Sequence, residues 1–329
     1  MYKSLKFTLL IILFLSLMFT ANNLQGQPVP SPEENIPFLV TFGKKAETSW
    51  GDNDFSQIWF FVVPKTYKGQ VFIRAFDPDT GGANDELNGV FDTRMQYSIY
   101  GGKDAYTHPD AQEVNPKKNF KTGILLSTKI FGVDANYDNK WYSFGPFDPV
   151  QGEFSSEFDG YMFKVICEGI DGDDGNMYRY FMSTSGTANV PIEGGNSFTH
   201  EYTFRLHDNP NEVSHIYPYV HPESTKIRTE NFDWDDDGTI RVTSEERREQ
   251  ACSVSGDNVW ARSEFAVKEG EKGKSLDFQF IKNKKTVIKN NNVVITVRNQ
   301  KGDLLRFFSA PIGGVPKYKY GIGVQKKPK

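Results

Sequence analysis

Leucine is scarce in this 329-residue sequence once the first 27 residues are set aside, because seven leucines lie in that leader and only eight follow it. Leucine is among the strongest helix formers, so the shortage argues against a helical protein. The sequence is instead rich in aromatic residues and glycine, which favour strands and turns. Forty-three aromatic residues follow the leader, enough to fill a hydrophobic core, and this excludes an intrinsically disordered chain.

Cysteine, histidine and the common catalytic motifs are also scarce or missing. The two cysteines, Cys167 and Cys252, leave open either one disulfide or two unpaired thiols. The five histidines show no zinc-site spacing, and there is no G-x-S-x-G elbow, P-loop or G-x-G-x-x-G fingerprint. Carboxylate pairs for glycoside cleavage can always be drawn from 42 acidic residues, so their number decides nothing. The sequence therefore predicts a protein that is not an enzyme.

Only one long apolar run is present, from Phe7 to Phe19, and it lies in the leader behind Lys3 and Lys6. A membrane span needs roughly 20 residues, so this run fits a cleaved signal peptide better than an anchor. We therefore predict an exported protein of the periplasm, the cell surface or the extracellular space, without a transmembrane segment in its mature form. Removing the two leader lysines takes the net charge from −4 to −6, which disfavours nucleic-acid binding.

Short apolar runs, alternating or continuous, recur along the rest of the chain between turn-forming residues. This pattern is typical of sandwiches. We predict an all-β protein with two tandem β-sandwich domains of jelly-roll-like type after the cleaved signal peptide. The predicted parts are a signal peptide at 1–27, a linker at 28–37, a first sandwich at 38–169, a second at 170–314 and a basic tail at 315–329. The predicted strands are Phe38–Phe42, Gln57–Val63, Gln70–Phe76, Met95–Tyr100, Gly123–Phe131, Trp141–Phe144, Tyr161–Cys167, Met177–Met182, Glu201–Leu206, Ser214–Val220, Thr225–Arg228, Thr239–Val242, Val259–Val267, Leu276–Ile281, Val293–Arg298 and Leu304–Phe308.

Two segments depart from simple alternation. The run from Ile58 to Val63 is apolar on both faces, which places it in the middle of a sheet that is covered on both sides. The polar segment Ser244–Ala251 is the one place where a helical turn is credible, and a solvated loop is the equal alternative.

The sharpest chemical signal is the acidic loop DWDDDGTI at 233–240. Its Asp233, Asp235 and Asp237 stand at positions 1, 3 and 5 of an EF-hand-type loop, with glycine at position 6 and the Thr239 carbonyl as a further ligand. Three close carboxylates repel one another unless a hard cation lies between them. Glu245 follows one residue later than the pattern requires, and no helix pattern flanks the loop. We therefore predict a structural calcium site in a turn between strands, with a metal-free Asp/Gly turn as the alternative.

A second acidic loop, at 77–86, carries Asp77, Asp79 and Asp85. Together with the WGDND turn at 50–54 it could form another oxygen cage for calcium, although its spacing matches no fixed template. A third acidic run, DGDD at 171–174, favours a solvated turn.

The passage from residue 52 to residue 169 resembles the pre-peptidase C-terminal type of jelly-roll module found beside secreted peptidases. It shows an Asp-rich turn leading into DFSQIWFFVVP, an Asp-led strand DTRMQYSIY and a closing strand at 160–169, in that order. Over its mature length the chain is also similar to uncharacterised exported bacterial proteins that often carry a downstream OmpA-like module, through FDPDTGG, WYSFGPF, SGDN and FDWDDDG. No such module follows here, so peptidoglycan anchoring is not expected. These resemblances imply accessory modules without catalysis, some of which bind calcium or carbohydrate.

Together these features predict an exported, non-catalytic, calcium-stabilised β-sandwich protein that serves as a binding or structural module, with a polysaccharide or another envelope protein as partner. One alternative is a carbohydrate-binding accessory protein, which requires a line of exposed tryptophans from the candidates Trp50, Trp141, Trp234 and Trp260. The other is a jelly-roll glycoside hydrolase, which requires a cleft with two facing carboxylates that do not surround a metal.

Overall fold

The computed structural model describes residues 28–112, 119–283 and 291–320, and every regular element longer than four residues within them is a β-strand. This confirms the predicted all-β fold. The predicted signal peptide at 1–27 and the last nine residues of the predicted tail lie outside the described residues. Four short 3-10 turns complete the secondary structure, namely η1 (Thr48–Trp50), η2 (Pro109–Gln112), η3 (Pro149–Gln151) and η4 (Glu269–Glu271). Within the described ranges, no helix is long and apolar enough to cross a lipid bilayer.

The described strands form four antiparallel sheets. The nine-stranded sheet contains, in spatial order, β18 (Trp260–Ala266), β15 (Lys226–Phe232), β21 (Asn292–Asn299), β12 (Glu201–Arg205), β2 (Phe38–Phe42), β10 (Gly175–Ser183), β4 (Val71–Phe76) and β7 (Trp141–Phe147), with β1 (Pro28–Val29) paired to β10. The seven-stranded sheet contains β22 (Phe307–Phe308), β11 (Asn196–Thr199), β3 (Ser56–Pro64), β9 (Gly160–Asp171), β5 (Arg94–Gly101) and β6 (Ile124–Phe131), with β8 (Glu153–Ser155) paired to β9. The smaller sheets contain β13 (Val213–Ile216), β20 (Asp277–Lys282), β16 (Gly238–Thr243) and β17 (Gln250–Cys252), and then β14 (Tyr219–Val220) and β19 (Lys274–Ser275).

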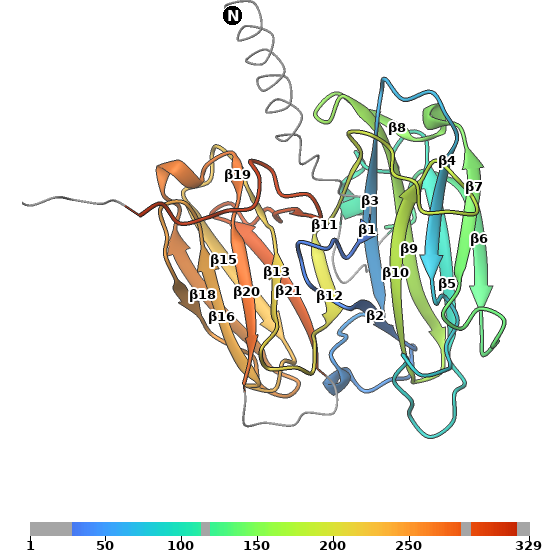
Figure 1. The fold of residues 1–329 in the computed structure, drawn as a ribbon, viewed down its shortest axis with the longest axis horizontal. Coiled ribbons are helices and arrows are strands. Elements are labelled where there is room, and N and C mark those ends of the chain that lie inside the picture. The colour runs from blue at the N-terminus through green and yellow to red at the C-terminus, as the bar shows by residue number, and fades with distance from the viewer. Residues whose placement is uncertain (1–27, 113–118, 284–290, 321–329) are drawn as a thin grey trace, which may run out of the picture.

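The seven-stranded and four-stranded sheets pack against the same face of the nine-stranded sheet. The ring of Trp59 in β3 lies 5.1 Å from that of Tyr202 in β12. The ring of Phe280 in β20 lies 5.2 Å from that of Phe204, also in β12. Tyr202 and Phe204 are two positions apart and therefore point to one face of their strand. The result is two sandwiches side by side, with β12 and β2 between them, around one continuous core (Figure 1).

The nine-stranded sheet extends through both predicted sandwich domains. The predicted boundary between residues 169 and 170 falls inside β9, and β10, which follows it, pairs with β2 and β4 of the first half. The two sandwiches therefore share a sheet, and the predicted domain limits stay a prediction.

Fifteen of the sixteen predicted strands are found, with shifts of a few residues at their ends. The sixteenth, Ser214–Val220, is divided into β13 and β14, which belong to different sheets. The two-faced strand β3 lies between β11 and β9, as its pattern predicts. Trp59 and Phe61 enter the main core, whereas Phe60 and Val62 join a second buried cluster on the other side of the sheet. The strands that the sequence did not reveal are the short β1, β8, β11, β17 and β19, which have at most four residues each and too little alternation to recognise.

Residues 244–249 form a tight turn between β16 and β17, and Gln250 and Ala251 already belong to β17, so the helical alternative does not hold. The loop alternative holds only in part, because the predicted loop was solvated whereas Ser244 and Arg247 are buried. The hydroxyl of Ser244 accepts hydrogen bonds from the backbone N–H groups of Glu246 and Arg247 at 3.2 and 2.9 Å. Such a side-chain-to-backbone turn competes with helix formation in a segment this short.

Cys167 and Cys252 are free thiols in the structure, so the unpaired alternative holds. Cys167 is buried in the main core, and burial raises its pKa to about 12. It therefore acts as a small apolar residue.

His200 marks the point where the chain passes from the seven-stranded to the nine-stranded sheet, and its titration gives a testable pH dependence. It is buried against the stacked rings of Phe60 and Phe198, each 5.7 Å away, and burial lowers its pKa to about 3. Between pH 6.5 and pH 3, therefore, His200 is protonated in the unfolded chain and neutral in the folded protein. We expect stability to fall by up to about 1.4 kcal/mol per pH unit between pH 6.5 and pH 3 through this residue.

The measurement is the free energy of unfolding against pH for the wild type and for His200→Phe, which keeps a planar ring without titration. The variant should lose this part of the acid slope and match the wild type above pH 7. The exposed His221→Phe is the control and should keep the slope. An unchanged slope in His200→Phe would contradict the assignment.

Candidate metal centres

Three groups of carboxylates meet among the described residues, each with one oxygen per residue within 4.8 Å of the others. We call them the Asp233 cluster (Asp233, Asp235 and Asp257), the Asp79 cluster (Asp77, Asp79 and Asp138) and the Asp174 cluster (Asp92, Asp173 and Asp174). Each joins the loop after one strand to a loop elsewhere in the chain. The three clusters differ in whether their buried carboxylate oxygens already accept hydrogen bonds from protein donors.

The Asp233 cluster lies where the turn after β15 meets the turn before β18. Asp233 is almost completely buried, and its Oδ1 accepts a hydrogen bond from the backbone N–H of Asn258. Its Oδ2 is buried without a hydrogen-bond partner in the described part of the chain. Since an unpaired buried carboxylate oxygen is costly, this atom indicates a missing partner such as a cation.

The turn of the Asp233 cluster is fixed by its backbone. The N–H groups of Trp234 and Asp236 donate to the hydroxyl and carbonyl oxygens of Ser255 at 2.9 and 2.8 Å. Asp233, Asp235 and Asp236 have φ angles of 59°, 49° and 55°, in the left-handed region that Asp and Asn tolerate better than other side chains. Burial, followed by repulsion between the carboxylates, raises the pKa values of Asp233 and Asp235 to about 6.

The other three residues of the predicted EF-hand-type loop lie outside this cluster. Asp237 is buried and forms an ion pair with Lys282, at 3.2 Å from its Nζ. Thr239 continues into β16, opposite Ile281. Glu245 pairs with Lys274 and with Lys319, at 2.9 and 2.7 Å. Lysines pair with Asp237 and Glu245, and the structure groups Asp233 and Asp235 with Asp257 instead. The EF-hand-type ligand set stays a prediction.

The Asp79 cluster lies between the loop after β4 and the loop that joins β6 to β7. Asp79 is completely buried, its Oδ2 accepts a hydrogen bond from the backbone N–H of Asp134 at 3.3 Å, and its Oδ1 has no partner among the described residues. Burial, then the charges of Asp138 and Asp77, raise the pKa of Asp79 to about 7. A side chain at Gly82, where φ is 69°, would come within 3.0 Å of the Asp138 carboxyl group. The chain therefore closes tightly around this carboxylate.

The sequence grouped Asp85 and the turn at 50–54 with this loop as possible calcium ligands. In the structure their carboxylates accept hydrogen bonds from backbone N–H groups. Asp85 accepts hydrogen bonds from the N–H groups of Gly81 and Met177, both at 2.7 Å, and so fastens its loop to β10. Asp52 accepts from the N–H groups of Phe42, Asp54 and Phe55. Neither Asp52 nor Asp85 belongs to the Asp79 cluster, in which Asp138 takes the third place.

In the Asp174 cluster the buried carboxylate is fully satisfied. Asp174 accepts hydrogen bonds from the backbone N–H groups of Asn88, Asp92 and Thr93, at 2.9, 2.8 and 3.2 Å. A carboxylate that holds three N–H groups serves the loop without a metal. The solvated turn that the sequence favoured for 171–174 is therefore not found, since Asp174 is fully buried and Asp171 is the last residue of β9.

The sequence did not point to Asp138 or Asp257 as ligands. Asp257 lies in the SGDN run at 255–258, which repeats the Gly-Asp pair of other turns, and Asp138 lies in the Asp- and Asn-rich run DANYDN at 134–139. Both signals are common in metal-free turns. Only strand pairing, which sets the loops side by side, reveals their partners.

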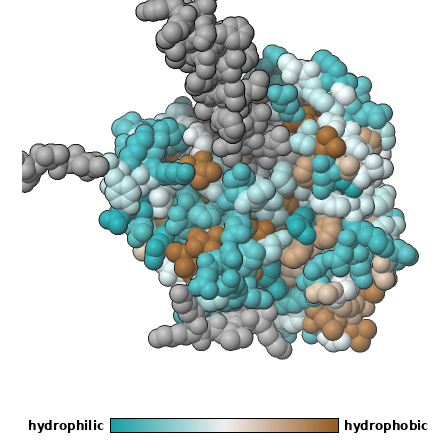
Figure 2. Space-filling model, in the orientation of Figure 1, coloured by the Kyte–Doolittle hydropathy of each residue, from teal (hydrophilic) through white to brown (hydrophobic). Residues whose placement is uncertain are grey.

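A carbohydrate-binding accessory protein requires a line of exposed tryptophans, and only one of the described tryptophans is exposed. Trp260 is 42% exposed on the edge strand β18, whereas Trp59 and Trp234 are buried and Trp50 and Trp141 are half-buried. Exposed apolar residues on the face shown in Figure 2 form separate small groups among hydrophilic ones. The described tryptophans therefore form no exposed line.

Two carboxylates that are not gathered in any of the three clusters, those of Asp54 and Glu201, line a cavity together with His200. Its volume is about 20 Å³ for the centre of a water-sized sphere, which admits one or two water molecules. A sugar ring does not fit, so this pair does not meet the requirement of a glycoside hydrolase.

No protein-family model matches the chain, and no curated protein is significantly similar to it. Among solved structures, the crystal structure of a "putative secreted protein" from Parabacteroides distasonis ATCC 8503 matches at 8% sequence identity, with 85% of this chain and 92% of that chain covered. The TM-score is 0.20, too low to support an argument about fold or function. The resemblance of residues 52–169 to pre-peptidase C-terminal modules stays a prediction.

Proposed function

We propose that this protein is an exported, non-catalytic β-sandwich protein of the bacterial cell envelope or secreted space, stabilised by calcium, and that it serves as a binding or structural module. The calcium ions would occupy the Asp233 and Asp79 clusters and would hold together the loops at the ends of the strands. We assign them a structural role, because each cluster joins loops from separate parts of the chain.

One observation carries the calcium proposal: each of these two clusters contains a buried carboxylate oxygen, Oδ2 of Asp233 or Oδ1 of Asp79, without a partner among the described residues. Three oxygens of separate carboxylates within 4.8 Å repel one another in the absence of a cation. Calcium prefers hard oxygen ligands and accepts irregular geometry, which suits loops that meet across a sheet. The Asp174 cluster lacks such an atom and is left out.

The test is thermal unfolding of the purified protein in chelator and in added calcium. Calcium that binds only the folded state should stabilise it by about 2.7 kcal/mol at a hundredfold excess over Kd. Asp235→Asn and Asp79→Asn should each remove part of the calcium-dependent shift, and together they should remove all of it. Asn is chosen because it keeps the left-handed backbone at position 235.

Asp236→Asn is the matched control. Asp236 is exposed, has a similar φ of 55° and lies outside the cluster, so this variant should keep the full calcium response. If the midpoint of the wild type is the same in chelator and in calcium, the metal proposal fails. In that case the buried carboxyl groups carry protons, and the Asn variants should raise stability with or without calcium.

A carbohydrate-binding accessory protein is the second candidate function. It is favoured by half-buried aromatic residues on the outer face of the nine-stranded sheet, over β2, β10, β4 and β7. Aromatic rings on a flat sheet face can stack on sugar rings.

A further inference from the structure

The outer face of the nine-stranded sheet, which is the face turned away from the main core, carries a row of side chains that crosses four neighbouring strands. Arg179 of β10 lies opposite Phe76 of β4, which in turn lies opposite Trp141 of β7. The pairing of β10 with β2 places Phe38 on the other side of Arg179. Four strands at about 4.8 Å spacing give this row a length of about 14 Å.

Solvent reaches this row but not the neighbouring part of the same face. Phe38, Phe76, Trp141 and Arg179 are all half-buried. Further along β2 and β10, the side chains of Val40, Phe42 and Met177 are fully buried, and they cluster with residues of the segment 46–55. The chain thus covers one part of this face and leaves the aromatic row accessible.

Two arginines lie among these rings without an acidic partner. The guanidinium group of Arg179 lies 4.8 Å from the ring centre of Phe38 and 4.5 Å from that of Phe76. The guanidinium group of Arg74 lies 5.2 Å from the ring centre of Trp141 and donates to Ser143 and Asn189. Within the described ranges neither arginine forms an ion pair, and the buried Nε of Arg179 has no hydrogen-bond partner.

On the other half of the same face, arginines have an acidic neighbour. There Arg228, Arg262 and Arg298 all lie within ion-pair distance of Glu230. The acid whose charge acts on Arg179 is Asp77, which already accepts hydrogen bonds from Asn84 and Asn139. Arg179 therefore remains available to an anion from outside, whereas Arg74 is only 5% exposed and lies beneath the ring of Trp141.

Phe181 of β10 lies opposite Arg74 and is half-buried, so it belongs to the same face. We propose that this aromatic–arginine face (Phe38, Arg74, Phe76, Trp141, Arg179 and Phe181) binds an anionic polysaccharide, whose sugar rings stack on the aromatic rings while the guanidinium group of Arg179 binds its carboxylate or sulfate groups. Planar guanidinium groups are well suited to such anions. The flat, extended row fits a chain of sugars better than a small ligand, which needs a concave pocket. The inference rests on the second candidate function, for which it names the class of carbohydrate, and it needs no calcium.

The test is calorimetric titration with polygalacturonate in the presence of chelator, with neutral dextran and anionic phospholipid vesicles as alternative ligands. Arg179→Gln should weaken polygalacturonate binding at least tenfold, and added salt should weaken the wild type. Arg262→Gln is the matched control, since it removes an arginine from the same sheet face outside the row, and it should bind like the wild type.

Trp141→Leu provides a second variant in case Arg179→Gln fails to fold, and it should weaken binding while it unfolds at the wild-type midpoint. Equal binding by the wild type and Arg179→Gln would overturn the proposal. So would dextran binding as tight as that of polygalacturonate, a preference for vesicles, or no binding at all. If chelator changes neither polygalacturonate binding nor the unfolding midpoint, the calcium proposal fails while this one stands.

Discussion

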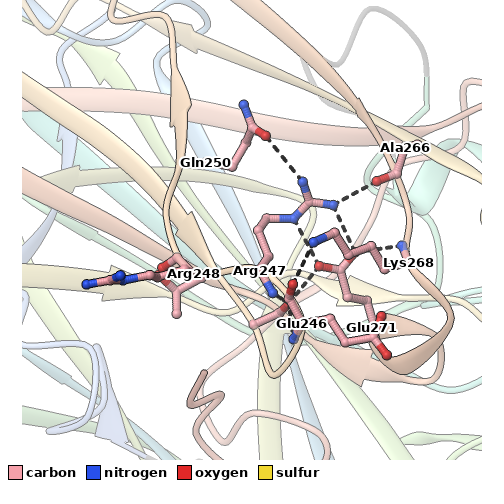
Figure 3. Close-up of polar contacts among 9 residues, drawn as sticks. Glu246, Arg247, Arg248, Gln250, Ala266, Lys268 and Glu271 are labelled. Carbon is pink, nitrogen blue, oxygen red and sulfur yellow. Dashed lines mark hydrogen bonds and ion pairs between the residues drawn. The ribbon is translucent and has the colours of Figure 1, made fainter. Parts of the chain in front are cut away.

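Replacing Glu271 by alanine should lower the free energy of unfolding by about 3–5 kcal/mol, since it leaves the guanidinium group of Arg247 buried without a counter-charge. The two side chains are 0% and 7% exposed and form two parallel N–H to oxygen contacts, at 2.9 and 3.0 Å (Figure 3). Ser244 and the backbone N–H of Lys268 also donate to the same carboxylate. Chemical unfolding of the wild type and the variant measures the difference.

Glu269→Ala is the matched control for this prediction. Glu269 begins the same short turn η4, but its side chain is 85% exposed and its pairing with Lys272 contributes about 1 kcal/mol at most. Replacing both partners, Arg247→Met with Glu271→Leu, should recover most of the loss, because it removes the uncompensated charge. A loss below about 1 kcal/mol in Glu271→Ala would show that the ion pair does not stabilise this turn.

The same pair also predicts a pH dependence. Burial alone would raise the pKa of Glu271, but the donors from Arg247, Lys268 and Ser244 outweigh it and hold the pKa below the ordinary value of 4.5. Its contribution is therefore fully present above pH 4.5 and is lost as the pH falls toward the lowered pKa of the folded protein. Glu271→Ala should lack this part of the acid transition.

Replacing Trp234 by alanine is expected to cost about 3–5 kcal/mol, the range for removing a large buried aromatic side chain. Trp234 is 1% exposed, packs 5.4 Å from the ring centre of Phe280 and donates its indole N–H to Asn291 at 3.0 Å. It stands between Asp233 and Asp235, so its side chain anchors their turn to the core. The variant should therefore also lose much of the calcium-dependent shift in unfolding temperature.

Trp260→Ala is the comparison for Trp234. Its ring is 42% exposed and rests on Phe232 at 5.1 Å, so its removal should cost about 1 kcal/mol or less. Calorimetry of the two variants with and without calcium compares their losses of stability and their calcium-dependent shifts in unfolding temperature. Equal losses in both would contradict the anchoring role of Trp234.

The strands could be predicted from the sequence because alternation with a period of two is a local property of the chain. The two-faced run at 58–63 even predicted that β3 would be covered on both sides. Residues 244–251 could not be decided in this way, because a helical turn and a Ser-capped loop differ by a few hydrogen bonds.

The candidate site was predictable only in part. The sequence identified Asp233 and Asp235, and Asp77 and Asp79, as acidic turns that immediately follow strands. It could not identify their third partners, because Asp138 lies 59 positions after Asp79 and Asp257 lies 22 positions after Asp235. Nor could it show that Lys282 and Lys274 would bind Asp237 and Glu245.

By itself, then, the shortage of leucine and the abundance of aromatic residues determined an all-β protein with a core built from Phe, Tyr, Trp, Val and Ile. Tertiary structure decided that two sandwiches share one sheet and which acidic turns meet. It also decided that Arg74 and Arg179 contact aromatic rings on one sheet face and form no ion pair with an acid of the described residues. The physical reason is that sequence spacing determines which groups can meet within one turn. Strand pairing determines which turns and which strand faces come together.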